Sequence, residues 1–207
     1  MPSVHPTLVI AAFEPELAPL STWGKAQADI VLATCGIGMV EAAATTAKLI
    51  HSCHPAEVLF IGSAGSVNRE VPLLSLFGAE RVSLADSQLL NNEAYLPETA
   101  KTSFPAQEKL LRSILSLSQH PLRGSVYTPA GISRGEDLGT LYSAKLNAYF
   151  ENLELFGVAA ACAIHDVPWG CLSCVTNYIG KDAHAEWQEN VSSAAQLTSE
   201  AVEELLS

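Results

Sequence analysis

Two polar side chains flank the most apolar stretch of the sequence and are the first candidates for chemistry. Glu154 precedes the alanine-rich run from Leu155 to Ile164, and Asn177 follows the run from Trp169 to Val175. A glutamate side chain offers two acceptor oxygens to hydroxyl groups, whereas an asparagine side chain donates and accepts hydrogen bonds but cannot supply a proton. These residue types favour ligand binding through hydrogen bonds at both ends of the stretch.

A helix and a strand are expected to position these two side chains. The alanine-rich run is almost wholly apolar, which is typical of a helix packed closely against a sheet. Asp166 ends this helix and Pro168 prevents its continuation, so the next apolar run forms a buried strand. Ligands of open α/β sheets bind outside the carboxyl ends of the strands. Glu154, where the helix begins, and Asn177, just past the strand, are therefore expected to face one crevice.

A second carboxylate candidate lies near the beginning of the sequence. Thr7 to Ala12 forms a short apolar strand, and Glu14 and Glu16 follow it, with Pro15 in the first turn of a helix. Acidic residues at a helix N-terminus are ordinary partners of the helix dipole, so a purely structural role stays open. If burial partly desolvates Glu16, its pKa rises and the side chain can act as a general base.

Two glycines form a turn after the predicted strand from Asp29 to Thr34. Gly36 and Gly38 lead into a helix from Val40 to Cys53. Glu41 occupies the third glycine position of a dinucleotide fingerprint, so we exclude a Rossmann nucleotide site. Close packing of the helix on the strand is an equal explanation for the glycines.

Small residues also follow the predicted strand from Glu57 to Ile61. The segment Gly62-Ser63-Ala64-Gly65 is predicted to be a loop at the carboxyl end of that strand. Small residues there let backbone amides and a hydroxyl group approach a ligand, and Ser63 is able to orient a water molecule. A plain strand-to-loop turn is the alternative.

The other segments complete one α/β domain that spans residues 1–207. We expect strands at Arg81 to Leu84 and Arg123 to Thr128, helices at Ala106 to Leu117 and Trp187 to Leu206, and a capping box of Ser133 and Glu136 for a helix that extends to Lys145. No repeat, linker or low-complexity tract divides the chain.

The composition restricts the classes of partner. The chain has 207 residues, of which 48% are hydrophobic and 16% charged, which indicates a globular protein with a full core. Its net charge of -11 argues against binding to nucleic acid or to an anionic membrane surface, because both attract Lys and Arg. We find neither the basic region of a signal peptide nor an apolar run long enough to span a membrane.

The five cysteines favour a reducing compartment. An odd number of cysteines on apolar segments is typical of a cytoplasmic protein. Cys171 and Cys174 form a CxxC pair, but residues three apart in a strand point to opposite faces of the sheet. We therefore expect no metal site at this pair.

The segment around Glu154 and Asn177 resembles the nucleoside phosphorylase/hydrolase superfamily. Leu153-Glu154 opens an alanine-rich helix, Val167-Pro168 leads into a strand, and the polar Asn177 follows it. Within this superfamily, the run from Thr176 to Asp182 together with Trp187 is most similar to futalosine hydrolases of menaquinone biosynthesis. The resemblance implies a single-domain, three-layer fold with a central twisted mixed β-sheet flanked by helices. It also implies a cytoplasmic homodimer that acts on a small-molecule nucleoside without a cofactor.

The resemblance assigns roles to individual residues. The ribose-binding candidates are Glu154, which binds the ribose hydroxyls, and the adjacent Leu153, and Asn177 contacts the purine at its N7 side. Glu16 activates the attacking water, and Ser63 belongs to the segment that contacts the ribose and the nucleophile. The further base-binding candidates are Ile132 and Gly131, and the further candidates near the nucleophile are Gly36, Gly38 and Gly65.

Two departures from related adenine nucleosidases bear on the substrate. Those enzymes usually carry Glu-Met-Glu before the buried helix, whereas Asn152-Leu153-Glu154 keeps only the second glutamate. They also usually carry aspartate where this chain has Asn177. Aspartate suits adenine because it accepts from the exocyclic amine, and asparagine suits a 6-oxopurine because its amide donates to N7 or O6.

Water is favoured over phosphate as the nucleophile. A phosphate site needs Arg or Lys, and the chain has only 11 of them, with Arg69 the nearest to the segment around Ser63. We predict a hydrolase that cleaves futalosine or 6-amino-6-deoxyfutalosine to the free base and dehypoxanthine futalosine. The alternatives are a 5'-methylthioadenosine/S-adenosylhomocysteine nucleosidase, a phosphorylase, and a non-catalytic purine-binding protein.

Overall fold

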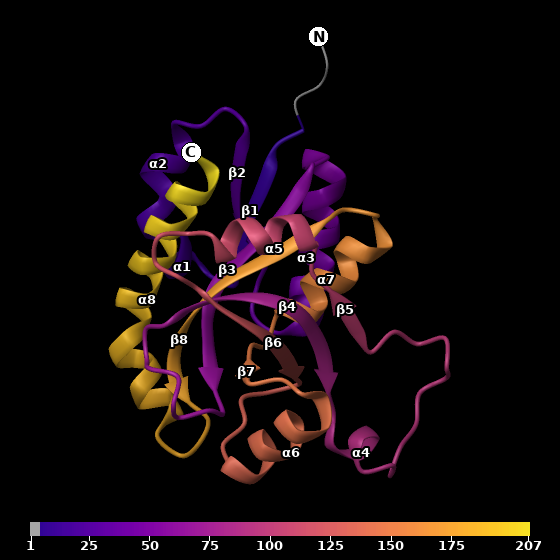
Figure 1. The fold of residues 1–207 in the computed structure, drawn as a ribbon. Helices are drawn as coiled ribbons and strands as arrows, with labels where there is room; N and C mark the ends of the chain where they lie inside the picture. Colours follow the sequence, from indigo (N-terminus) through magenta and orange to yellow (C-terminus); the bar gives the residue numbers. More distant parts are fainter. Residues whose placement is uncertain (1–4) are drawn as a thin grey trace.

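The computed structural model describes residues 5–207 and shows an eight-stranded mixed sheet with helices on both faces (Figure 1). The strands are β1 (Thr7–Ala11), β2 (Ile30–Thr34), β3 (Glu57–Ser66), β4 (Leu76–Ala85), β5 (Ser103–Pro105), β6 (Leu122–Pro129), β7 (Phe150–Glu151) and β8 (Trp169–Tyr178). The helices are α1 (Glu14–Leu17), the 3-10 helix η1 (Ala18–Leu20), α2 (Ser21–Lys25), α3 (Met39–Cys53), α4 (Ser87–Leu90), α5 (Glu108–Leu115), α6 (Glu136–Leu146), α7 (Leu155–Ile164) and α8 (Ala183–Leu206). The predicted α/β architecture with a central mixed sheet is confirmed.

The strand pairing brings the ends of several distant segments to one edge of the sheet. The order is β2-β1-β3-β7-β6-β4-β5, and β8 pairs with both β3 and β4. Because β8 joins β3 to β4, the strands β3, β7, β6, β4 and β8 form a closed ring of pairings. Strands β1, β3 and β8 run parallel, so their carboxyl ends lie at the same edge.

Two hydrophobic cores lie on the two faces of the sheet. Phe60 of β3 points into a core that includes Val158 of α7 and residues of α3. Its neighbour Leu59 points to the other face, into a core that includes Ala201 of α8 and residues of η1 and α5. Alternate residues of a strand point to opposite faces, so one apolar strand serves both cores. The result is the three-layer arrangement of helices, sheet and helices visible in Figure 1.

Helix α7 packs against the sheet, as the sequence predicted, and it also packs closely against helix α3. A Cβ atom at Gly157 would lie 2.1 Å from the backbone oxygen of Met39 in α3. Only glycine lets the two helix backbones approach this closely at that position.

Two strands extend beyond their predicted ends. The segment from Gly62 to Gly65 lies inside β3 and is not a loop, and Asn177 lies inside β8 rather than past it. Both strands continue further because β3 and β8 pair in parallel as far as Ser66 and Tyr178, so each supplies hydrogen-bond partners to the other. Glycine at position 65 leaves room for the neighbouring strand, since a Cβ atom there would lie 2.9 Å from Nδ2 of Asn177.

The predicted capping box before α6 is wrong. Gly135 is the residue that caps α6, and it makes no side-chain capping bond. The backbone N–H of Ser133 instead donates to Glu151 at 3.0 Å, and Glu136 pairs with Arg69 at 3.0 Å on the surface. Both members of the expected box therefore have tertiary partners that the local pattern does not contain.

Candidate active site

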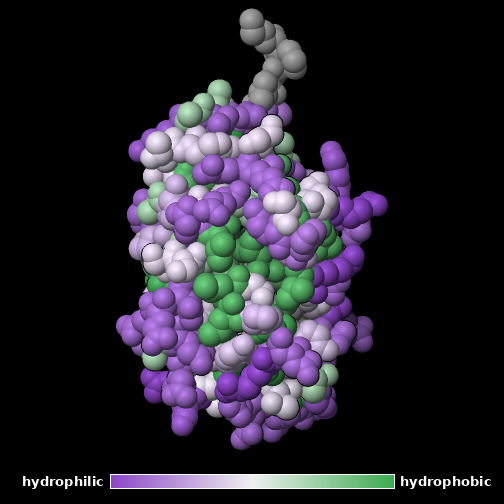
Figure 2. Space-filling view, turned by 60° about the vertical axis from the view of Figure 1, so that its left-hand side comes forward, coloured by the Kyte–Doolittle hydropathy of each residue, from purple (hydrophilic) through white to green (hydrophobic). Residues whose placement is uncertain are grey.

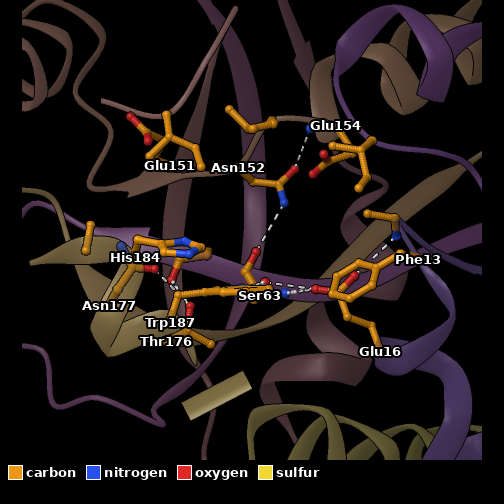
Figure 3. A pocket seen from close by; sticks show the side chains of 17 residues that line it. Phe13, Glu16, Ser63, Glu151, Asn152, Glu154, Thr176, Asn177, His184 and Trp187 are labelled. Atoms are coloured by element: carbon orange, nitrogen blue, oxygen red, sulfur yellow. Dashed lines mark hydrogen bonds between the residues drawn. The ribbon is translucent and has the colours of Figure 1, made fainter. Parts of the chain in front are cut away.

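A pocket opens at the carboxyl ends of β1, β3 and β8, near the beginning of α8 (Figure 3). It brings together the predicted site residues Glu16, Ser63, Gly65, Ile132, Leu153, Glu154 and Asn177. Three other predicted residues, Gly36, Gly38 and Gly131, do not line the pocket, although their neighbours Ile37 and Ile132 do. The sheet edge predicted from the parallel strands is therefore the edge at which the pocket lies.

Glu16 is a buried carboxylate held by three hydrogen bonds. The backbone N–H and the hydroxyl group of Ser63 each donate to its Oε1 at 2.8 Å, and the N–H of Ala12 donates to its Oε2 at 3.2 Å. Burial raises the pKa of Glu16 from 4.5 to about 7, while the bonds from Ser63 act in the opposite direction. The neighbouring Glu14 is exposed. Glu16 is thus the member of the pair whose environment suits proton transfer near neutral pH.

Glu154 lies at the N-terminus of α7 and faces the same pocket. Its side chain is buried, and its Oε1 accepts from the backbone N–H of Gly38 at 2.9 Å. Gly38 therefore holds this carboxylate without lining the pocket itself. Burial raises the pKa of Glu154, and its charge is one of the causes that raise the pKa of Glu16. The two carboxylates are close enough to interact through their charges.

An irregularity in β8 places two polar residues in the pocket. The register between β3 and β8 shifts so that Ala64 pairs with Val175 and Gly65 pairs with Asn177. Thr176 is the extra residue, and both Thr176 and Asn177 line the pocket although neighbouring strand residues normally alternate in direction. The Thr176 hydroxyl donates to Oδ1 of Asn177 at 3.0 Å, and Nδ2 of Asn177 donates to the Tyr178 carbonyl at 3.3 Å. An amide nitrogen has two hydrogens, so Nδ2 keeps one for a ligand.

Asn152 connects the two carboxylate-bearing parts of the pocket. Its Oδ1 accepts from the N–H groups of Glu154 and Leu155, which caps the beginning of α7. Its amide nitrogen donates to the carbonyl of Ser63 at 3.2 Å. Asn152 therefore links β3 to the start of α7.

Glu151 is a pocket residue that was not among the predicted site residues. It is 5% exposed, and burial raises its pKa. Oε1 accepts from the N–H of Ser133, but Oε2, the hydroxyl group of Tyr127 and the hydroxyl group of Ser133 are buried without a hydrogen-bond partner among the described residues. The available signal in the sequence was a carboxylate directly after the apolar Phe150 and close to the candidate Glu154.

Aromatic side chains form a further part of the lining. Trp187 of α8 lies between Phe13, with ring centroids 6.2 Å apart, and His184, with ring centroids 5.7 Å apart and planes inclined by 17°. Its indole N–H donates to the Ser63 hydroxyl oxygen at 3.2 Å. From the sequence, Trp187 was named only as part of the resemblance to futalosine hydrolases, and no contact was predicted for it.

The pocket lining is poor in positive charge. No lysine or arginine lines it in the described part of the chain. Within residues 5–207, no group of three or more His, Cys, Asp or Glu side chains is placed to hold a metal ion. The helices that the structure describes include none with the length and hydropathy of a membrane span.

Sequence comparison finds one matching protein family and distant relatives. A family model described as "Phosphorylase superfamily" matches residues 13–207. The 5'-methylthioadenosine/S-adenosylhomocysteine nucleosidase of Baumannia cicadellinicola subsp. Homalodisca coagulata is 24% identical and covers 88% of this chain and 90% of that protein. The enzyme of the same name from Staphylococcus aureus is also 24% identical, with 86% and 82% covered.

Two solved nucleosidase structures share the fold. The futalosine hydrolase of Helicobacter pylori strain 26695 superposes with a TM-score of 0.90 at 18% identity, over 98% of this chain and 97% of that one. The 5'-methylthioadenosine/S-adenosylhomocysteine nucleosidase of Helicobacter pylori, solved with butyl-thio-DADMe-Immucillin-A, superposes with a TM-score of 0.89 at 18% identity, over 98% of this chain and 97% of that one.

Proposed function

Because the chain belongs to the phosphorylase superfamily, we propose that it is a nucleosidase that cleaves the N-ribosyl bond of a purine nucleoside with water. The observation that carries this proposal is Glu16, a buried carboxylate with a pKa of about 7 in a pocket that also contains Glu154 and Asn177. The names of the sequence relatives and of the similar structures support the same class of activity.

The pocket residues divide the work of hydrolysis among them. Glu154 accepts hydrogen bonds from the ribose hydroxyls. It thereby holds the ribose in place while positive charge develops on the sugar ring. Ionised Glu16 takes a proton from a water that Ser63 orients, and the resulting hydroxide attacks the anomeric carbon. The bond to the base breaks with its electron pair leaving on the purine. Asn177 stabilises that purine by hydrogen bonding, and solvent supplies its proton, since an amide cannot.

Water is the favoured nucleophile because the pocket suits an uncharged one. A phosphate dianion placed between Glu16 and Glu154 would be repelled by both carboxylates. The lining holds no described Lys or Arg to compensate, and Arg69 is engaged by Glu136. Phosphorolysis is therefore the weaker alternative.

We further propose futalosine or 6-amino-6-deoxyfutalosine as the substrate, in menaquinone biosynthesis. The spare amide hydrogen of Asn177 suits N7 or O6 of a 6-oxopurine, and the run from Thr176 to Asp182 resembles futalosine hydrolases. The second candidate is 5'-methylthioadenosine or S-adenosylhomocysteine, which is favoured by the names of the sequence relatives.

We also propose that the protein is a cytoplasmic homodimer. All five cysteines are free thiols in the structure. Free thiols are typical of a reducing compartment, which supports the cytoplasmic location. The dimeric state rests on the family resemblance alone, and sedimentation at several salt concentrations tests it.

A substrate panel tests the proposed activity. The purified protein is incubated with futalosine, its 6-amino-6-deoxy analogue, 5'-methylthioadenosine and S-adenosylhomocysteine, each with and without phosphate, and the free base is measured by chromatography. We expect base release that does not require phosphate, and a loss of about a hundredfold to ten-thousandfold in kcat for Glu16→Gln. Release only with phosphate would identify a phosphorylase. No release from any nucleoside, with tight binding of free purine, would identify a binding protein.

A further inference from the structure

A chain of hydrogen bonds runs from the last helix to the reactive carboxylate (Figure 3). The indole N–H of Trp187 donates to the hydroxyl oxygen of Ser63 at 3.2 Å. The Ser63 hydroxyl donates in turn to Oε1 of Glu16 at 2.8 Å. Ser63 and Glu16 have roles in the proposed hydrolysis, whereas the indole N–H has none so far.

The chemistry of the indole group fixes the direction of this chain. An indole N–H donates and has no lone pair with which to accept a hydrogen bond. The Ser63 oxygen must therefore be the acceptor from Trp187, which leaves its own hydrogen to point towards Glu16. A hydroxyl group that accepts one hydrogen bond is polarised and becomes a stronger donor for the next.

The two oxygens of Glu16 are consequently unequal. Oε1 accepts two bonds of 2.8 Å from Ser63, one from its backbone N–H and one from its hydroxyl group. Oε2 accepts a longer bond of 3.2 Å from the Ala12 N–H. Oε2 is therefore the oxygen with the greater remaining capacity to accept a proton from water.

The surrounding aromatic rings hold the indole in the orientation this chain requires. Phe13, directly before α1, lies on one side of the Trp187 ring, and His184, one turn earlier on α8, stacks on it. A side chain packed on two sides loses little further freedom when it donates a hydrogen bond. The indole is thus preorganised before substrate enters.

We propose that Trp187 is a positioning residue that fixes the Ser63 hydroxyl towards Glu16 and so prepares Glu16 to accept a proton from water. The inference rests on the proposed hydrolytic function and adds to it a residue of α8, an element that carries none of the catalytic groups named above. It makes the start of α8 part of the machinery that controls proton transfer.

The groups around Glu16 determine the direction of the expected effect. Burial and the charge of Glu154 raise the pKa of Glu16, and the charge of Glu16 in turn helps to raise the pKa of the Cys35 thiol. On the α8 side, His184 lines the pocket and stacks on Trp187, and Glu186 accepts from the backbone N–H of Tyr178. The donors from Ser63 oppose the upward shift. Removal of the indole N–H weakens one of these donors, so the pKa of Glu16 rises further.

The test compares Trp187→Phe with wild type, because phenylalanine keeps an aromatic ring between Phe13 and His184 and removes the N–H. We expect the acid limb of the kcat/KM profile to move to higher pH by about half a unit to one unit, with activity nearly restored above it. Trp23→Phe makes the same chemical change away from the pocket and leaves the profile in place. In a Ser63→Ala background, Trp187→Phe has no further effect on the profile, because the relay through the hydroxyl group is already absent.

A second measurement needs no turnover and separates this inference from the proposed function. The Glu16 carboxyl group is titrated by carbon-13 NMR in glutamate-labelled protein, and Glu16→Gln identifies its signal. We expect a higher midpoint in Trp187→Phe than in wild type, even if no nucleoside is cleaved. Equal midpoints would overturn the positioning role and leave the proposed function intact. If base release fails but the midpoint still moves, the proposed function is wrong and the relay stands.

The wild-type protein gives an independent readout if Trp187→Phe does not fold. Its three tryptophan indole N–H signals are followed by nitrogen-15 NMR as the pH changes, and Trp23→Phe and Trp169→Phe assign the third signal by elimination. The Trp187 signal should titrate with the midpoint of Glu16 and lose that step in Glu16→Gln. A Trp187 signal that ignores Glu16 would refute the relay.

Discussion

Glu16 shows at the residue scale how the site and the stability of the fold oppose each other. Its pKa is about 7 in the folded protein against an ordinary value of 4.5. Below about pH 4.5 the group is protonated in both the folded and the unfolded state. No charge is then buried on folding, and the raised pKa does not lower the stability of the protein. The destabilisation grows as the pH rises from there and is complete above about pH 7, where the group is ionised in both states.

Glu16→Gln should therefore become more stable relative to wild type as the pH rises. Between about pH 4.5 and pH 8 we expect the difference in unfolding free energy to change by up to about 3 kcal/mol in favour of the variant. Glutamine cannot accept at both side-chain positions, so the bond from Ala12 is weakened at every pH and offsets a constant part of the gain. Urea unfolding at several pH values measures the trend. Glu14→Gln, at an exposed neighbour, is the control, and an equal pH dependence in both variants would contradict the assignment.

Asn177 is the residue through which base choice can be changed. Asn177→Asp removes the amide donor and adds a charge that repels a purine carbonyl and attracts an exocyclic amine. We expect the ratio of kcat/KM values to shift by about tenfold to a hundredfold from the 6-oxo towards the 6-amino nucleoside. The ratio is measured for wild type and variant with matched 5' substituents. An unchanged ratio would mean that Asn177 does not read the base.

The members of the site were predictable from the residues and from the family resemblance together. Glu154 and Asn177 were predicted from their positions to face one crevice, the resemblance added Glu16 and Ser63, and the structure places all four in one pocket. The hydrogen bonds were not predictable, because they join residues far apart in sequence. The bond from Trp187 to Ser63 spans 124 positions, and that from Gly38 to Glu154 spans 116. Roles that depend on such bonds require the tertiary structure.

Strand ends are the elements that the sequence predicted least well. Local patterns ended β3 at Ile61, since glycine and serine follow, but pairing with β7 and β8 extends it to Ser66. A strand continues for as long as its neighbours supply hydrogen-bond partners, and those neighbours are distant in sequence. The bulge at Thr176 also depends on pairing between distant segments, because it arises from a register shift between β8 and β3. In contrast, α7 was predicted from Leu155 to Ile164, as observed, because its composition and the following proline act locally.

The contact between α3 and α7 provides a test at the scale of elements. Alanine at Gly157 would place a Cβ atom 2.1 Å from the Met39 carbonyl oxygen, so the helices must separate. We expect Gly157→Ala to destabilise the protein by about 1–3 kcal/mol or more, even though alanine favours a helix by about 1 kcal/mol. Urea unfolding measures the loss. Gly131→Ala, where a new Cβ atom meets no heavy atom within 4 Å, is the control. If both variants unfold alike, the helices do not require this close approach.

The whole molecule combines a strong negative charge with a hydrophobic surface area. Figure 2 shows hydrophobic side chains gathered in the middle of one face and surrounded by hydrophilic ones. The structure also exposes several large hydrophobic residues, among them Ile37 and Ile132 at the pocket and Val40 at the start of α3. Hydrophobic surface of this kind is typical of interaction sites. The net charge of -11 on each copy opposes association of two copies.

The proposed homodimer should therefore associate more strongly as salt is added. Two copies that each carry a charge of -11 repel each other over about 30 Å in roughly 0.01 M salt, but over only about 3 Å near 1 M. Hydrophobic burial is not weakened in the same way, so sedimentation velocity should show the dissociation constant falling severalfold or more across this range. Lowering the pH towards 5 protonates part of the carboxylates and should reduce the salt dependence. A monomer at every salt concentration, at micromolar protein, would contradict the dimer. A dimer that weakens with salt would mean that ion pairs, rather than hydrophobic contacts, hold the two copies together.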